Sequence, residues 1–225
     1  MDKSRTESLI GKENVEKLSQ KHITVVGVGG VGGYTAVMLA RAGIENMTII
    51  DFDEVAPSNL NRQIVAYQST IGRKKVDVLK DMLLDINPNM TITAYDKRLT
   101  KANISSLITQ TDIVIDAIDS VKDKLDLIEY CKNNNVYILS AMGVGNRYAI
   151  PEFELTDIYY THDDGLAKKL RNELRKRGIS SLDVVASKFK ARKVEGVIGS
   201  ISYYPATSGC FISAVIVNKI IQGDL

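Results

Sequence analysis

Short apolar runs alternate with amphipathic stretches between residues 22 and 143. The apolar runs contain many β-branched residues, which is typical of buried strands. They predict strands at residues 22–28, 46–53, 90–96, 112–119 and 136–143. The amphipathic stretches predict helices at residues 31–43, 73–87, 101–108 and 121–135, and the stretch 53–70 reads as a loop with a short helix.

Strands and helices that alternate at this spacing predict a mostly parallel sheet covered on both faces. The expected fold class is therefore α/β, a Rossmann-like doubly wound sheet. Ligands of such sheets bind beyond the carboxyl ends of the strands. Those ends carry residues 27–32, 51–53, 116–119 and 141–146, and we expect the chemistry of the protein there.

The pattern changes after residue 150. We predict a basic helix at 165–177, a loop at 178–196, a strand at 197–205 and an apolar helix at 209–221, which suits a core or a dimer interface better than a membrane anchor. The expected organisation is an N-terminal helical arm (1–22), a Rossmann-like nucleotide-binding domain (23–150) and a small C-terminal α+β extension (151–225) packed as part of the same unit.

Composition narrows the class of protein. Of 225 residues, 44% are hydrophobic and 25% are charged, as in ordinary globular proteins. No apolar run approaches the roughly 18 residues that cross a bilayer, and the polar N-terminus does not resemble a secretory signal. The two cysteines form no CxxC pair, which argues against a disulfide scaffold or structural zinc. We expect a cytoplasmic protein without a membrane partner.

Charge is distributed unevenly along the chain. Residues 165–194 contain ten basic and two acidic side chains, a net charge of +8, whereas the whole chain carries only +2. A basic segment on an acidic body suggests a polyanionic partner. A solvated helix face followed by a loop explains the charge equally well, so both interpretations stay open.

A glycine-rich turn follows the first predicted strand and opens the first predicted helix. Residues 27–32 read G-x-G-x-x-G, and such glycines allow a tight turn whose free N–H groups bind phosphate oxygens. Asp51 ends the next strand, 19 residues past Gly32, where an acid binds ribose hydroxyls. NAD, FAD and ATP all remain open at this point.

The residues downstream of the turn favour ATP. Arg62 can contact phosphate oxygens with two N–H groups and Lys75 offers a point charge, as a triphosphate requires. Asp119 ends the fourth strand and is the candidate ligand for the Mg²⁺ that accompanies ATP. No GxxxxGK[ST] sequence occurs, so a P-loop enzyme is excluded.

The motifs GVGGVG, DFDEV, SNLNRQ, GRKKVD, INP and DAIDS follow one another between residues 27 and 120. This series resembles the adenylating enzymes related to ubiquitin activation. The resemblance implies that a substrate carboxylate attacks the α-phosphate of ATP. It implies that Arg62, Lys75 and Asp119 are catalytic together with Arg5, an N-terminal arginine that reaches the partner's triphosphate in a homodimer. The implied nucleotide-binding residues are Gly27, Gly29, Gly30, Gly32, Asp51, Asp53, Ser58, Asn59, Asn61, Arg62, Gln63, Lys75, Asp119 and Ser120.

Within that family, sulfur-carrier adenylyltransferases commonly carry CxxC pairs, which this chain lacks. The segments 5–11, 116–122 and 155–171 resemble tRNA threonylcarbamoyladenosine dehydratases, which implies activation of a threonine carboxylate and cyclisation with loss of water. A tRNA substrate suits the +8 segment. The candidate tRNA contacts are Lys168, Lys169, Arg171, Arg175, Lys176 and Arg177.

Two other functions stay open: activation of a ubiquitin-like sulfur carrier, and nucleotide binding without turnover. A sulfur-transfer partner such as a cysteine desulfurase or its acceptor is a further possibility that the family resemblance raises. Cys131 falls on one side of its predicted helix with Leu125 and Ile128, which predicts a packed core thiol. Cys210 begins the apolar helix at 209–221, and a non-reactive role is favoured over a reactive thiol.

Overall fold

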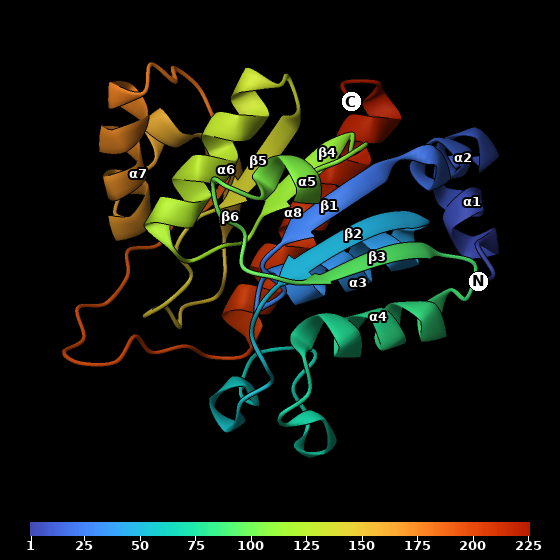
Figure 1. Ribbon diagram of the computed structural model, residues 1–225, viewed down its shortest axis with the longest axis horizontal. Coiled ribbons are helices and arrows are strands. Elements are labelled where there is room, and N and C mark those ends of the chain that lie inside the picture. The colour runs from blue at the N-terminus through green and yellow to red at the C-terminus, as the bar shows by residue number, and fades with distance from the viewer.

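A computed structural model describes all residues from 1 to 225 and contains one seven-stranded sheet in the order β3-β2-β1-β4-β5-β7-β6 (Figure 1). Every neighbouring pair of strands is parallel except β6–β7. The strands are β1 (His22–Val26), β2 (Asn46–Asp51), β3 (Thr91–Asp96), β4 (Ile113–Asp116), β5 (Tyr137–Ala141), β6 (Phe153–Asp157) and β7 (Asp183–Ser187). The predicted α/β, Rossmann-like sheet is confirmed.

Helices cover both faces of this sheet (Figure 1). They are α1 (Ser4–Ile10), α2 (Lys12–Gln20), α3 (Gly32–Ala42), α4 (Lys75–Ile86), α5 (Ile104–Leu107), α6 (Val121–Asn133), α7 (Gly165–Lys176) and α8 (Tyr203–Gln222), with short 3-10 turns η1 (Pro57–Asn59), η2 (Gln68–Thr70) and η3 (Ile158–Tyr160). One core of 29 buried residues lies under α3, α4 and α8, and another of 20 lies under α5, α6 and α7. Successive strand residues alternate between the two cores, so Val25 belongs to the first and Val26 to the second.

The C-terminal part corrects the sequence-based expectations. The predicted loop 178–196 contains β7, and the sequence pattern did not predict the preceding strand β6. The predicted strand 197–205 is wrong: residues 197–202 are irregular, and α8 begins at Tyr203 instead of 209. Pro205 stands in the first turn of α8, where its missing N–H has no intrahelical partner to lose.

The earlier start of α8 also overturns the expectation that no segment is long enough to span a membrane. By length and composition α8 meets that requirement, with a mean hydropathy of 1.2 over 18 residues. The helix nevertheless packs along α3, and Tyr204, Ile212 and Ile216 belong to the first core. The prediction of a core helix is therefore confirmed.

The N-terminal residues form two short helices at the amino end of the sheet (Figure 1). Val15 and Leu18 of α2 are buried, whereas α1 buries no residue. The helical character of the predicted arm is confirmed, and the division into three segments stays a prediction.

Candidate functional site

The glycine turn between β1 and α3 is held by backbone contacts that exclude larger residues. Gly27 has a φ of +86°, and a Cβ atom there would lie 2.7 Å from the carbonyl oxygen of Ala117. A Cβ at Gly32 would overlap the carbonyl of Gly27. No side chain caps the N-terminus of α3, and the N–H groups of residues 29–32 make no hydrogen bond within the protein, so they are free for an anion, whereas the N–H of Gly33 donates to the carbonyl of Gly29 at 3.1 Å.

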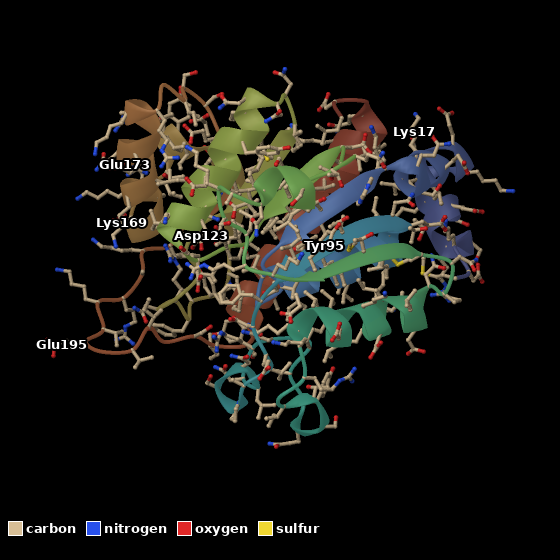
Figure 2. The ribbon with its side chains drawn as sticks, viewed as in Figure 1. Lys17, Tyr95, Asp123, Lys169, Glu173 and Glu195 are labelled. Carbon is tan, nitrogen blue, oxygen red and sulfur yellow. The ribbon has the colours of Figure 1, made fainter.

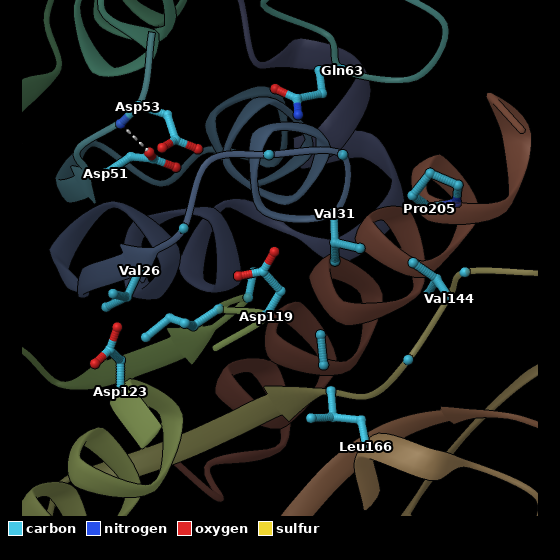
Figure 3. A pocket seen from close by; sticks show the side chains of 18 of the residues that line it. Val26, Val31, Asp51, Asp53, Gln63, Asp119, Asp123, Val144, Leu166 and Pro205 are labelled. Atoms are coloured by element: carbon cyan, nitrogen blue, oxygen red, sulfur yellow. Dashed lines mark hydrogen bonds between the residues drawn. The ribbon is translucent and has the colours of Figure 1, made fainter. Parts of the chain in front are cut away.

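A cavity of about 670 Å³ opens beside this turn, beyond the carboxyl ends of β1, β2, β4 and β5 (Figure 3). Strand order reverses between β1 and β4, which is the switch point where ligands of such sheets bind. The predicted site residues that line the cavity are Gly27, Gly29, Gly30, Asp51, Asp53, Asn59, Arg62, Gln63, Lys75 and Asp119. Gly32, Ser58, Asn61, Ser120 and Arg5 do not line it.

Two carboxylates that follow β2 are engaged within the protein. Asp51 accepts hydrogen bonds from the N–H of Val28 (2.8 Å) and of Asp53 (2.9 Å), so it fastens the glycine turn to the end of β2. Asp53 accepts a 2.7 Å hydrogen bond from the ammonium of Lys75, whose side chain is only 5% exposed. The pair keeps a buried cation at the cavity wall, where a lone ammonium would be costly.

Arg62 is oriented by the two predicted residues beside it. Its Nη1 donates to the carbonyl of Ser58 and to Oδ1 of Asn61, both at 2.9 Å. No hydrogen bond uses Nε or Nη2 of Arg62, so these groups remain for a ligand. Ser58 and Asn61 therefore position the guanidinium and do not line the cavity themselves.

Gln63 carries a buried acceptor that the protein leaves without a partner. Its side-chain oxygen makes no hydrogen bond although the residue is only 8% exposed and lines the cavity. Such groups are almost always satisfied in proteins, so a donor from a ligand or from water is expected here. Asn59, also buried, uses its Oδ1 to accept from the N–H of Ala56 at 3.0 Å.

Asp119 follows β4 and points into the cavity (Figure 3). Its exposed carboxylate makes no hydrogen bond or ion pair within the protein. No group of three or more His, Cys, Asp or Glu residues is placed to hold a metal ion. A single free carboxylate nevertheless suits Mg²⁺, which binds proteins through one or two carboxylates together with the phosphates of a substrate. The adjacent Ser120 caps α6 by accepting from the N–H of Asp123 at 3.5 Å.

A buried ion pair below the cavity was missed by sequence reasoning. The Lys124 ammonium lies 2.8 Å from Oδ2 of Asp116, and both side chains are fully buried. Ser140 on β5 donates a 2.7 Å hydrogen bond to the same carboxylate. Lys124 falls on the apolar side of α6 one turn before Ile128, and this misplaced lysine was the available signal. The pair ties α6 to the ends of β4 and β5.

The cavity wall opposite the glycine turn was also missed by sequence reasoning. The carboxylate of Asp164 caps α7 through the N–H of Ala167 (2.9 Å) and accepts from the N–H of Gly143 (2.9 Å). Buried Arg147 donates to the carbonyl of Gly143 at 2.7 Å, so residues 143–145 are held against α7. Lys97 and Lys169 line the cavity and form no ion pair.

The six candidate tRNA contacts divide into two groups. Arg171 donates to the carbonyl of Thr161 at 2.9 Å, and Arg177 pairs with Glu129 at 2.9 Å, so both are built into the fold. Lys168, Lys169, Arg175 and Lys176 are exposed, and only Lys169 reaches the cavity. Figure 2 shows Lys169 on α7.

Arg5 lies on α1, at the other end of the molecule from α7 (Figure 1). It is exposed and forms no ion pair. It makes no contact with the cavity of its own chain, and its role in a partner's site stays a prediction.

The two cysteines differ in environment. Cys131 is fully buried, which confirms the predicted core thiol, and burial raises its pKa to about 12. Cys210 is exposed on α8, yet partial burial of its thiol raises the pKa above the ordinary value. A raised pKa disfavours the thiolate, so neither cysteine has the environment of a nucleophile.

A mostly parallel sheet that presents a glycine turn and cations at its switch point places this protein among the Rossmann-like nucleotide-binding proteins. Residues 2–216 match the sequence model of the ThiF family, so the chain belongs to the ThiF family. This membership confirms the family resemblance, whereas the roles of individual site residues stay predictions.

Similar proteins include the tRNA threonylcarbamoyladenosine dehydratase of Bacillus subtilis, which is 39% identical over 177 residues, 78% of this chain and 70% of that protein. The Escherichia coli dehydratase is 38% identical over 171 residues, 76% of this chain and 64% of that protein. Crystal structures of the E. coli enzyme in complex with AMP and with ATP superpose with TM-scores of 0.93 and 0.92 at 32% and 33% identity, and cover 98% of this chain and 94% of those chains. The matched regions thus span about two thirds of the curated relatives.

Proposed function

We propose that this protein is an ATP-dependent tRNA threonylcarbamoyladenosine dehydratase. The observation that carries the proposal is the superposition of nearly the whole chain on the E. coli dehydratase in its AMP and ATP complexes. Supporting it, the cavity gathers the glycine turn, the cations of Arg62 and Lys75 and the free carboxylate of Asp119. The tRNA substrate comes from the similarity to the dehydratases.

In this proposal the triphosphate lies over residues 27–32, where free N–H groups of the turn and the start of α3 bind its oxygens. Arg62 and Lys75 stabilise the negative charge that moves onto the leaving pyrophosphate. Asp119 would hold Mg²⁺, which supplies further charge neutralisation when it is bound with ATP. The orphan oxygen of Gln63 would accept a hydrogen bond from the nucleotide.

The proposed reaction has two steps. A carboxylate oxygen of the substrate's threonine bonds to the α-phosphorus, the bond from that phosphorus to the bridging oxygen breaks, and pyrophosphate leaves. An atom of the same substrate side chain then attacks the activated carbonyl, loses its proton and expels AMP. The original carboxylate oxygen leaves on AMP, so the nucleoside becomes lighter by one water. Ring closure is intramolecular, so proximity suffices and no protein nucleophile is needed.

The test is mass spectrometry of nucleosides from modified tRNA incubated with the protein, ATP and Mg²⁺. We expect a nucleoside lighter by one water, with AMP and pyrophosphate formed in equal amounts. Arg62→Ala should slow this conversion by a factor of about 10 or more, because a charge-assisted hydrogen bond is lost. An unchanged nucleoside mass with active wild-type protein would overturn the proposal. Pyrophosphate exchange that depends on a small protein ending in Gly-Gly would favour a sulfur-carrier adenylyltransferase instead.

We also infer a homodimer in which Arg5 serves the partner's site. Arg5 is exposed, unpaired and remote from its own cavity, as a residue that acts across an interface should be. Mixing Arg5→Ala protein with Lys75→Ala protein should restore part of the activity that each lacks alone, because one site in the mixed dimer is intact. Absence of complementation would exclude this role, provided that light scattering shows a dimer and co-purification of differently tagged chains shows that the subunits exchange. A sulfur-transfer partner and a cytoplasmic location stay predictions.

A further inference from the structure

Residues 188–202 connect β7 to α8 without helix or strand (Figure 1), and residues 198–200 of this connection line the cavity. Asn146, with a φ of +57°, fastens this connecting segment at two points. Its N–H donates to the carbonyl of Gly199 (2.8 Å), and its side-chain oxygen accepts from the N–H of Gly199 (2.6 Å). Its carbonyl accepts from the N–H of Arg192 (2.8 Å). The connecting segment therefore has a defined place beside the site, and Glu195 marks its outer bend in Figure 2.

The connecting segment, the loop before β6 and the first residue of α8 expose an unusual amount of apolar surface. Of the 13 large hydrophobic side chains that are exposed in the whole chain, seven lie here. They are Tyr148, Ile150, Val194, Val197, Ile198, Ile201 and Tyr203. Exposed apolar side chains gathered in one region mark an interaction surface. Ile198 also lines the cavity, so this surface continues into the site.

Two exposed tyrosines and an arginine are held together on this surface. The Arg192 guanidinium lies 5.0 Å from the ring centre of Tyr148, which is 60% exposed. The hydroxyl of Tyr203 donates a 2.6 Å hydrogen bond to the carbonyl of Tyr148. Aromatic rings and guanidinium planes are the groups on which unpaired bases stack. We call these three side chains the stacking surface.

The net charge of the connecting segment distinguishes between the molecules that could bind this surface. The connecting segment contains four basic residues (Lys188, Lys190, Arg192 and Lys193) and one acid (Glu195), a net charge of +3. A second copy of this positive segment would be repelled, whereas a polyanion would be attracted. Phosphates on lysines and bases on aromatic side chains together describe single-stranded nucleic acid.

We propose that the stacking surface binds an unpaired base of the tRNA loop that carries the modified nucleoside, while lysines of the connecting segment contact the flanking phosphates. The inference rests on the proposed function, because that function supplies the RNA. Residues 198–200 line the cavity, so a loop seated on the stacking surface would present its neighbouring nucleoside to the site.

The experiment measures the affinity of full-length protein for a fluorescent stem–loop RNA, which reproduces the tRNA loop that carries the modified nucleoside, and for a fully paired RNA of equal length. Tyr148→Leu and Arg192→Gln should each weaken stem–loop binding by about 5- to 150-fold, the range that one base stack contributes. Binding of the paired RNA and of ATP should change by less than twofold. The Arg192→Gln variant keeps the backbone hydrogen bond to Asn146, so the segment stays in place.

Matched controls are Tyr160→Leu and Arg41→Gln. Tyr160 is 72% exposed on η3, and Arg41 is exposed near the end of α3 without an ion pair. Neither control should alter stem–loop binding. Equal losses for both RNAs, no loss in the Tyr148 variant, or a change of oligomeric state in light scattering would each overturn the inference. Wild-type protein that never removes water from modified tRNA would contradict the proposed function, whatever these affinities show.

Discussion

The charged side chains at the site differ in whether they already have a partner within the protein. Lys75 is buried and paired with Asp53, whereas Asp119 has no protein partner. The sequence motifs predicted ten of the residues that line the cavity, because the carboxyl ends of parallel strands meet at one edge. They did not reveal that Ser58 and Asn61 orient Arg62, since such contacts depend on the path of an irregular loop.

Lys75→Met should reduce ATP affinity by about 10- to 150-fold, because it removes a charge-assisted contact but keeps an apolar stem of similar length. Titration with a fluorescent ATP analogue measures the effect. Lys74→Met is the matched control: Lys74 pairs with Glu54 and Asp96 and does not line the cavity. Equal losses in the two variants would show that Lys75 acts through overall charge and not through contact.

The Cys131 thiol should make stability depend on alkaline pH. Burial raises its pKa from 9.0 to about 12, with a smaller contribution from the charge of Asp116. The folded protein therefore keeps a proton that the unfolded chain loses. The resulting stability is complete below pH 9 and declines as the pH rises toward 12. Between about pH 8 and pH 10, the free energy of unfolding of the wild type, measured with urea, should fall by roughly 1.4 kcal/mol more than that of Cys131→Ala. A constant difference between the two proteins would contradict this.

At the scale of elements, the regular alternation up to β5 was predictable because each strand and helix carries its own periodicity. Strand β7 was not, because its position depends on partners far away in the sequence. It pairs with β5 on one side and antiparallel β6 on the other, and four of its five residues are buried. The start of α8 was misjudged because Tyr203 and Tyr204 have strand propensity, whereas tertiary packing of Tyr204 favours the helix.

The close contact between α3 and α8 predicts that one methyl group added at Gly209 strongly affects stability. A Cβ atom at Gly209 would lie 2.6 Å from the carbonyl oxygen of Val31 and 2.9 Å from Cβ of Tyr34. Gly209→Ala should therefore lower the free energy of unfolding by about 1–3 kcal/mol, although alanine favours helices. Gly165→Ala is the matched control in α7, where nothing lies within 4 Å of the added atom. Thermal unfolding of both variants tests this, and an equally stable Gly209→Ala protein would refute the close contact.

On the scale of the whole molecule, charge is divided between an acidic body and the basic residues 165–194. The structure shows that this basic stretch combines three different environments. Part of it is built into the fold through Arg171 and Arg177, part is the exposed face of α7, and part belongs to the connecting segment 188–202. Sequence composition predicted the charge but could not separate these roles, because ion pairs join residues distant in the chain.

The packing of α8 in the first core has a consequence for proteolysis. Trypsin should cut the exposed connecting segment at Lys190, Arg192 or Lys193. The released piece contains α8, whose apolar side is embedded between α3 and the sheet. We therefore expect the two fragments to elute together in gel filtration and to separate only in denaturant. The nicked protein should still bind ATP but bind the stem–loop RNA less tightly. The covalent link after β7 would then serve RNA recognition, while the integrity of the fold depends on non-covalent packing alone.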